Sequence, residues 1–320
     1  MSGPITLPQL ISSALSVHPD PVLIVDERRR LRYCNKSALE LLDADERQLI
    51  GKEVNGAFLH FGTSANEKLV SFIDGYFRHF RKAATIKEYV LESESHWRGA
   101  LEIRIEPILP EEKNMHEGVQ FVLVVLRDVT SQRDLNNQLH YQATHDPLTG
   151  LLNRREFENK LAEFIQHHRQ TGVRHTFCFI DLNKFKCIND KYGHIAGDNL
   201  LKELSERLLS QLRKGDVLGR IGGDEFGLIL GGCHDRDALR VLQSIQNYLL
   251  NYRFSYKQKN FQITASMGVI DISHEHKSVQ EMINMADLAC YKAKQLKPGI
   301  GGIVQVTESA ESSDKYSACI

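Results

Sequence analysis

Three carboxylates stand where short strand-like segments of this sequence end. Asp181 directly follows the run 176–180, and Asp224 and Glu225 follow the pair Gly222-Gly223. The glycine pair is free to take positive φ and lies between apolar residues, which predicts the tight turn of a β-hairpin. Neighbouring side chains of a strand point to opposite faces, so one core cannot bury both Asp224 and Glu225 without a compensating cation.

Three carboxylates at one edge of a sheet repel one another unless hard cations hold them. Mg²⁺ prefers such an all-oxygen environment and keeps coordination positions for substrate phosphates. In two-metal phosphoryl transfer, one ion activates the attacking hydroxyl and both ions neutralise charge on the transferring phosphate. The two glycines would let a triphosphate approach the backbone closely. An isolated Asp-Glu pair after two glycines is more often a solvated turn, so the rest of the chain decides the interpretation.

The composition narrows the class of protein. The chain has 320 residues and a formal net charge of −1, which predicts two domains and gives no indication of nucleic-acid or membrane-surface binding. The longest apolar run, 121–126, is far shorter than the roughly 20 residues of a membrane helix, and the N-terminus lacks the layout of a signal peptide. We expect a soluble, cytoplasmic protein whose six cysteines are reduced structural thiols.

The first half of the chain mixes strand and helix patterns after a lead-in at residues 1–14. Alternating apolar residues predict strands at 21–25, 31–34, 86–91, 97–108 and 119–126, and helical spacing predicts helices near 38–42 and 66–82. This order, with Asn35 after the second strand and Asp128-Val129-Thr130 at the end, resembles a PAS sensor domain over residues 15–128. The resemblance leaves its ligand unknown, because lone histidines such as His60, His79 and His96 are more often surface or core residues than haem ligands.

Residues 129–144 predict a helix that joins the two domains, with Val129, Leu135 and Leu139 on one face. This face covers too few turns to establish a coiled coil. A second domain follows over residues 145–305. Its pattern predicts a strand at 176–180, a polar loop, helices at 197–212, 236–251 and 278–296, and a strand at 261–271, which together favour a mixed sheet covered by helices. The tail 306–320 lacks periodic apolar residues and predicts disorder.

Residues 145–297 resemble a GGDEF-type diguanylate cyclase, and the resemblance runs through several separated motifs. It implies an α/β (α+β) fold, with a palm-like mixed sheet, and the condensation of two GTP molecules to cyclic di-GMP and two pyrophosphates. The matching motifs are the hairpin Gly222 to Phe226; Asp181-Leu182-Asn183-Lys184-Phe185-Lys186; Ile188-Asn189-Asp190; Gly193-His194; Gly197-Asp198; Asp146-Pro147-Leu148-Thr149-Gly150-Leu151; and Asn153-Arg154.

The resemblance also implies the role of each site residue. Asp181, Asp224, Glu225 and the Leu182 carbonyl would hold two Mg²⁺ ions, for which Mn²⁺ is an alternative. Glu225, with Asp224 as the other hairpin acid, is favoured as the acceptor of the ribose 3′-hydroxyl proton. The groups implied for substrate are Asn189 and Asp198, with His194 between them, for guanine, and the backbone amides around Phe185 and Lys186, with the ammonium groups of Lys186 and Lys294, for the phosphates.

Arg213 and Asp216 fit the family's Arg-x-x-Asp product-inhibition site, at the family's spacing from the hairpin. A guanidinium can donate to a guanine edge or a phosphate, and a carboxylate can accept from guanine. One departure follows Lys294: the family usually has Gly-Arg-Asn there, and this chain has Lys297-Pro298-Gly299. Lys297 would be a point-charge substitute without the bidentate geometry of arginine.

The sequence thus predicts a PAS-regulated diguanylate cyclase that acts as a homodimer, binds GTP and cyclic di-GMP, and contacts neither nucleic acid nor membrane. Two alternatives stay open. One is a catalytically silent receptor that binds cyclic di-GMP through Arg213 and Asp216. The other is a cyclase with a different nucleotide, which Asn189 and Asp198 disfavour.

Overall fold

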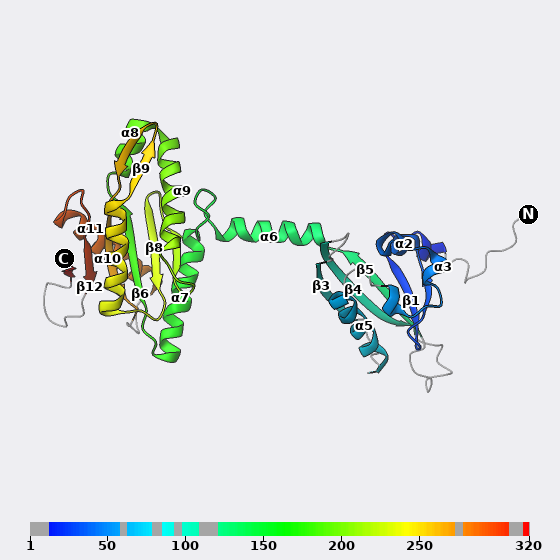
Figure 1. The fold of residues 1–320 in the computed structure, drawn as a ribbon. Helices are drawn as coiled ribbons and strands as arrows, with labels where there is room; N and C mark the ends of the chain where they lie inside the picture. Colours follow the sequence, from blue (N-terminus) through cyan, green and yellow to red (C-terminus); the bar gives the residue numbers. More distant parts are fainter. Residues whose placement is uncertain are drawn as a thin grey trace, which may run out of the picture. The chain divides into compact units, whose positions relative to one another are not determined.

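The computed structural model describes residues 13–57, 63–78, 85–92, 98–108, 121–272, 278–306 and 316–319. The chain divides into two compact units, Met1–Gln138 and Leu139–Ile320, each described by itself below (Figure 1). The division falls within the predicted linker helix, residues 129–144. The exact domain boundaries stay predictions. Within the described ranges, every helix is too short or too polar to cross a lipid bilayer.

The first unit is an antiparallel sheet covered by short helices, as predicted. Strands pair in the order β2-β1-β5-β4-β3, and every pairing is antiparallel. Residues 13–16, which follow the lead-in, are helical. The elements are β1 (Val22–Asp26), β2 (Leu31–Cys34), α2 (Lys36–Leu42), α3 (Glu46–Leu49), α4 (Val54–Ala57), α5 (Thr63–Arg78), β3 (Thr85–Glu92), β4 (Arg98–Ile108) and β5 (Phe121–Asp128).

One face of this sheet carries the core of the unit. Val122, Val124 and Leu126 of β5 are buried, and the residues between them are not, as the two-residue period of a strand requires. They pack with helical residues such as Leu42 and Ile73. The strand pattern of the sequence therefore identified the strands of this sheet.

Asn35 explains why the chain turns sharply after β2. Its buried side chain accepts hydrogen bonds from the backbone N–H groups of Val22 and Ala38, both at 2.9 Å, and donates to the carbonyl of Asp20 at 2.9 Å. It thereby caps α2 and fastens the segment before β1 to the sheet. At the other end of the unit, Asp128 accepts from the N–H of Thr130 at 2.9 Å and caps the next helix.

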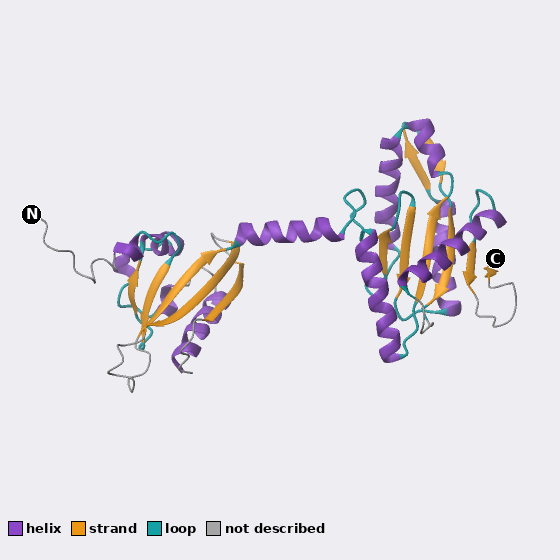
Figure 2. Cartoon of the chain, turned by 180° about the vertical axis from the view of Figure 1, so that it is seen from behind, coloured by secondary structure: helices purple, strands orange, loops and turns teal. Residues whose placement is uncertain are grey.

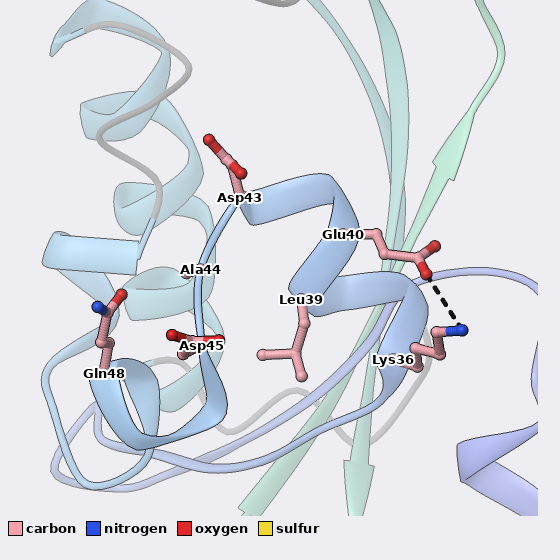
Figure 3. Close-up of a pocket in the computed structure, with 7 residues that line it drawn as sticks. All are labelled: Lys36, Leu39, Glu40, Asp43, Ala44, Asp45 and Gln48. Atoms are coloured by element: carbon pink, nitrogen blue, oxygen red, sulfur yellow. Dashed lines mark ion pairs between the residues drawn. The ribbon is translucent and has the colours of Figure 1, made fainter.

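A surface pocket of about 490 Å³ lies between α2 and the start of α3 (Figure 3). Lys36 and Glu40 on its wall form an ion pair at 3.6 Å, and most of the lining side chains are exposed. The pocket is thus open to the surface of the unit, although Leu39 and Ala44 also pack against the core, and it assigns no PAS ligand. His60, His79 and His96 lie outside the described residues. The lining residues are Lys36, Leu39, Glu40, Asp43, Ala44, Asp45 and Gln48.

The second unit is a sheet with helices on both faces (Figure 2), which confirms the predicted α/β layering. Strands lie in the order β13-β12-β11-β6-β8-β7, and only β11 and β12 pair in parallel. The elements are α6 (Thr130–Thr144), which crosses the division between the units, α7 (Arg154–Thr171), β6 (Thr176–Leu182), α8 (Phe185–Tyr192), α9 (His194–Ser210), β7 (Val217–Arg220), β8 (Glu225–Leu230), α10 (Asp235–Asn251), β9 (Arg253–Tyr256), β10 (Lys259–Gln262), β11 (Ala265–Asp271), α11 (Val279–Leu296), β12 (Ile303–Val306) and β13 (Tyr316–Cys319).

The central strand β6 is buried on both faces. Cys178 and Ile180 belong to the core shared with α9 and α10, whereas Phe177 and Phe179 belong to the core shared with α7 and α11. Such a continuous apolar run is expected of a strand covered on both sides. Because Asp181 comes near the end of this strand, its position is fixed by two cores at once.

Two predictions about the second unit are wrong. The segment after Asp181, predicted as a polar loop, contains the helix α8, whose only buried residue is Ile188 and whose start has no side-chain cap. The predicted strand 261–271 is two strands: β10 pairs with β9 in a separate hairpin, and β11 pairs with β6. The turn of that hairpin has Lys257 and Gln258 at positive φ, where glycine or asparagine is usual, so no turn was recognised.

The end of the chain also differs from its prediction. Residues 316–319 form β13, which pairs antiparallel with β12, although the tail 306–320 was predicted to be disordered. Backbone pairing to the edge of the sheet needs no apolar periodicity in the added strand. The sequence pattern therefore carried no signal for this strand.

His175, directly before β6, is buried, and both of its ring nitrogens have partners. Its Nδ1 accepts from the N–H of Gly232 at 2.7 Å, so Nε2 carries the proton and donates to Nδ1 of His167 at 3.0 Å. The ring of Phe164 meets it edge-on at 4.8 Å. Burial, with the neighbouring His167 and His168, lowers the pKa of His175 to about 4.

We expect the free energy of unfolding to fall as the pH decreases from about 6.5 to about 4. The unfolded chain protonates His175 near pH 6.5 and the folded chain only near pH 4, so acid favours unfolding by at most about 1.4 kcal/mol per pH unit. Urea titrations of the wild type and His175→Gln across this window measure the effect. The variant should be less stable at pH 7 and have a flatter profile, whereas equal slopes would contradict the assignment.

Candidate active site

Strand pairing brings the three predicted acids together. Asp181 of β6 is the register partner of Glu225, the first residue of β8. The N–H of Leu182 donates to the carbonyl of Asp224 at 3.2 Å. Because register partners on antiparallel strands point to the same face, the Asp181 and Glu225 carboxylates share one face of the sheet. The convergence predicted from separated motifs is therefore seen in the backbone.

The acids have too little positive charge around them. Asp181 Oδ2 contacts Lys294 Nζ at 2.6 Å, but its Oδ1 is buried and has no hydrogen-bond partner in the part of the chain that the structure describes. Burial raises the pKa of Asp181, as do Asp224 and Asp287, and Lys294 only partly opposes this. Burial, followed by the charges of Asp181, Asp287 and Asp224, also raises the pKa of Glu225. The cluster would gain most from an added cation.

Asp287 is a member of this cluster that sequence reasoning missed. It lies seven residues before Lys294 on α11, which is two helical turns and the same face. Between them, Cys290 donates to the carbonyl of Ser266, the register partner of Asp181, at 3.2 Å. The spacing of Asp287 and Lys294 on one helix face was the available signal, and it gains meaning only once α11 is placed against β6 and β11.

The donor atoms of the predicted metal ligands are of the type that a divalent cation prefers. Within the described residues, no three His, Cys, Asp or Glu side chains gather closely enough to hold an ion as they stand, and Lys294 contacts Asp181 instead. The unpartnered Asp181 Oδ1 and the carboxylates of Asp224 and Glu225 are nevertheless the hard oxygen donors that Mg²⁺ takes. The Leu182 carbonyl lies on the same strand end; the side chain of Leu182 is buried.

The hairpin glycines were predicted to provide positive φ, but the structure shows a different role, which is to leave room for neighbouring side chains. Neither Gly222 nor Gly223 has a positive φ. A Cβ on Gly222 would collide with the carboxylate of Glu225, whereas a Cβ on Gly223 would meet nothing within 4 Å. Gly222 therefore gives room to the Glu225 side chain, and the open side of the turn lies at Gly223.

Arg220, the last residue of β7, fixes this turn. Its guanidinium donates to the carbonyls of Gly222 at 3.0 Å and Gly223 at 2.8 Å, and to both carboxylate oxygens of Asp146 at 3.0 and 3.2 Å. Burial raises the pKa of Asp146, but hydrogen bonds from Thr149 and Arg220 outweigh it and hold that pKa below its usual range. The motif at the opening of the domain is thus fastened to the turn that carries the acids.

The predicted guanine-reading residues come from α8 and α9. Asn189 Oδ1 is buried and has no hydrogen-bond partner among the described residues. It lies against Gly197, where any Cβ would collide with it and would come within 2.9 Å of the Phe185 ring. His194 and Asp198 are exposed one turn apart on α9. The structure therefore brings Asn189 beside the segment that carries Asp198, with an acceptor left for a ligand.

The groups predicted to bind the substrate phosphates lie mainly at the start of α8. This helix begins at Phe185, and its first turn has neither an acidic residue nor a side-chain cap, so the first N–H groups have no intrahelical partner. The Phe185 ring packs against the core, and Lys186 is exposed. The ammonium of Lys294, which was also predicted to bind phosphate, lies 2.6 Å from Asp181 Oδ2.

Arg213 and Asp216 contact each other before β7. Arg213 Nε donates to Asp216 Oδ1 at 3.3 Å, and Arg213 Nη2 donates to the carbonyl of Gly231 at 2.5 Å. Asp216 Oδ1 also accepts from the N–H of Gly231 at 3.2 Å. The Asp216 side chain is 5% exposed and the Arg213 side chain 61% exposed. Asp216 is thus an anchor of the local backbone, and Arg213 is the member of the pair that faces solvent.

Two family models match the chain. Residues 143–298 match the family described as diguanylate cyclase, GGDEF domain, and residues 9–75 match the PAS domain family. The first range contains all the acids, the α8 and α9 residues and Arg213. Both predicted resemblances are therefore confirmed at the level of the domain family.

The chain is similar in sequence to one protein named as a probable diguanylate cyclase and to one named as a cyclic di-GMP phosphodiesterase. The probable diguanylate cyclase DgcE of Escherichia coli is 39% identical over 193 residues, which are 60% of this chain and 18% of that protein. The cyclic di-GMP phosphodiesterase PdeB of Shewanella oneidensis is 32% identical over 279 residues, which are 86% of this chain and 30% of that protein. This chain spans less than a third of the length of either relative.

A solved structure supports the fold of the second unit. The coiled coil and GGDEF domain of DgcB from Caulobacter crescentus, in complex with cyclic di-GMP, aligns with a TM-score of 0.51. It is 23% identical, and the alignment covers 54% of this chain and 92% of that chain. Residues 143–298 of this chain are a GGDEF domain of the diguanylate cyclase family, and residues 9–75 belong to a PAS domain.

Proposed function

We propose that this chain condenses two GTP molecules to cyclic di-GMP and two pyrophosphates. The observation that carries the proposal is the register pairing of Asp181 with Glu225, next to Asp224 and Lys294, inside a GGDEF domain. The buried Asp181 Oδ1, which has no hydrogen-bond partner among the described residues, supports a further cation at these acids. Asp181, the Leu182 carbonyl, Asp224 and Glu225 would hold two Mg²⁺ ions, or Mn²⁺ in their place.

The reaction is an in-line transfer at phosphorus. The 3′-oxygen of one GTP forms a bond to the α-phosphorus of the second, and the bond from that phosphorus to the bridging oxygen breaks and releases pyrophosphate. The reciprocal transfer closes the ring and releases the second pyrophosphate. Glu225 accepts the proton of the 3′-hydroxyl. Bound divalent ions would supply positive charge to the transferring phosphate. The first N–H groups of α8, with Lys186 and Lys294, orient the triphosphate for attack.

Guanine selectivity comes from α8 and α9. Asn189 offers an amide whose oxygen is buried without a partner, and Asp198 offers an exposed carboxylate. The carboxylate accepts from N1–H and N2–H of guanine, which adenine cannot supply, so the wrong base leaves these groups unpaired. His194 lies one turn from Asp198 on the same helix and closes the rim of this site.

Each GGDEF domain holds one GTP, so the reaction needs two domains face to face. The homodimer that we propose is formed through α6, where Leu135 and Leu139 are 55% and 53% exposed one turn apart. The PAS domain would control how the two domains meet. Product feedback through Arg213 completes the proposed regulation, with Asp216 holding the backbone from which Arg213 projects.

One incubation tests the proposed reaction. Purified protein is mixed with GTP or ATP and Mg²⁺ or Mn²⁺, and the nucleotides are separated by chromatography. We expect cyclic di-GMP from GTP alone and no product without a divalent ion. Binding of cyclic di-GMP without turnover would instead identify a silent receptor, and a cyclic product from ATP would overturn the guanine assignment.

Removing the charge of one acid tests the metal assignment. Asp224→Asn and Glu225→Gln should each lower kcat at least about a hundredfold, because each substitution removes a charged ligand of the transferring phosphate's cations. Neither change adds bulk at these half-buried positions, so the melting temperature should stay close to that of the wild type. Glu206→Gln, at an exposed position of α9, is the matched control. Full activity in either hairpin variant would remove the mechanism.

The feedback site has its own test. Arg213→Ala should raise the inhibition constant for cyclic di-GMP at least about tenfold, because a charge-assisted donor is lost, and should leave kcat in the absence of product unchanged. Initial rates over a range of product concentrations measure both. Asp216→Asn should in addition lower the melting temperature, because its buried carboxylate holds Gly231. An unchanged inhibition constant in Arg213→Ala would dismiss the site.

A further inference from the structure

Lys184 has an unusual backbone conformation at the start of α8. It is the residue before the helix and has φ 60° and ψ 19°, in the left-handed region. Residues with a side chain rarely take this conformation. No side-chain hydrogen bond caps the helix here, so the conformation is not explained by capping.

The end of the Lys184 side chain lies beside a glycine from the other end of the domain. A Cβ on Gly299 would lie 2.8 Å from both Cε and Nζ of Lys184. Gly299 has φ +76°, and its carbonyl accepts from Thr264 Oγ1 at 3.0 Å. Asn183 donates to the same Thr264 oxygen at 3.1 Å. The residue before Lys184 and the glycine that touches its ammonium are thus tied to one threonine.

The Lys184 ammonium has no anionic partner among the described residues. No ion pair or hydrogen bond of its side chain is found among the described residues, whereas Lys294 is held by Asp181 at 2.6 Å. Lys184 also follows Asp181 by three residues and adjoins the first turn of α8, which carries no acidic side chain. A helix N-terminus and a free ammonium together favour an anion. Pro298 and Gly299 supply no cation of their own.

We propose that Lys184 binds the terminal phosphates of GTP and that Gly299, which has no Cβ, leaves the space its ammonium needs for this contact. This inference rests on the proposed function, since it names a further substrate-binding residue of the same site. Lys184 would then add a positive charge near the end of α11, beside those of Lys186 and Lys294.

Binding measurements separate this role from turnover. Lys184→Met should weaken binding of a GTP analogue with a non-cleavable α,β linkage about tenfold, as expected for a lost charge-assisted contact. Affinity for GMP, which lacks the terminal phosphates, should change less than about twofold. Lys184→Arg should keep most of the affinity. Lys191→Met, at an exposed lysine of the same helix, is the matched control and should bind like the wild type. Calorimetric titration measures each of these affinities.

A second variant tests the space at Gly299. Gly299→Ala places a methyl group against the Lys184 ammonium, so it should weaken binding of the analogue as well, and combining it with Lys184→Met should add little. Equal affinity of Lys184→Met and wild type for the analogue, or an equal loss for GMP, would overturn the inference while leaving the proposed function intact. A wild type that binds no GTP analogue would overturn both.

Discussion

The pairing register of β6 and β8 is the constraint on which the site depends. It places Asp181 opposite Glu225 and leaves an oxygen of Asp181 buried without a partner. Like charges in a partly buried position oppose folding unless cations compensate them. The strand is held in this register by two cores, one on each face. The free energy of the cores therefore stabilises an arrangement of acids that would not form alone, and substrate with its metal ions can relieve it.

The surroundings of the acids keep their geometry fixed. Arg220 ties the hairpin turn to Asp146, and Gly222 makes room for the side chain of Glu225. Phe157 reaches the hairpin from α7, since a Cβ on Gly219 would lie 2.7 Å from its ring. These contacts join the N-terminal part of the domain to the hairpin turn beside Asp224 and Glu225. A change in how the domain begins thus has a short physical route to the acids.

The sequence predicted the site better than its supports. Asp181, Asp224 and Glu225 could be grouped because a buried strand and a glycine turn have strong local patterns. Asp287 and Lys184 could not be found, because their meaning depends on how α11 lies against the sheet and on a contact with Gly299. The α8 helix was missed because only Ile188 is buried, and β13 because edge pairing needs no apolar pattern.

The most direct measurement is a crystal structure with a GTP analogue and Mn²⁺, in which anomalous scattering locates the metal. The account predicts Mn²⁺ bonded to Asp181 and to at least one of Asp224 and Glu225, with guanine at Asn189 and Asp198. Nucleotide bound with no metal at these acids, or with the ion at a different group of residues, would contradict it.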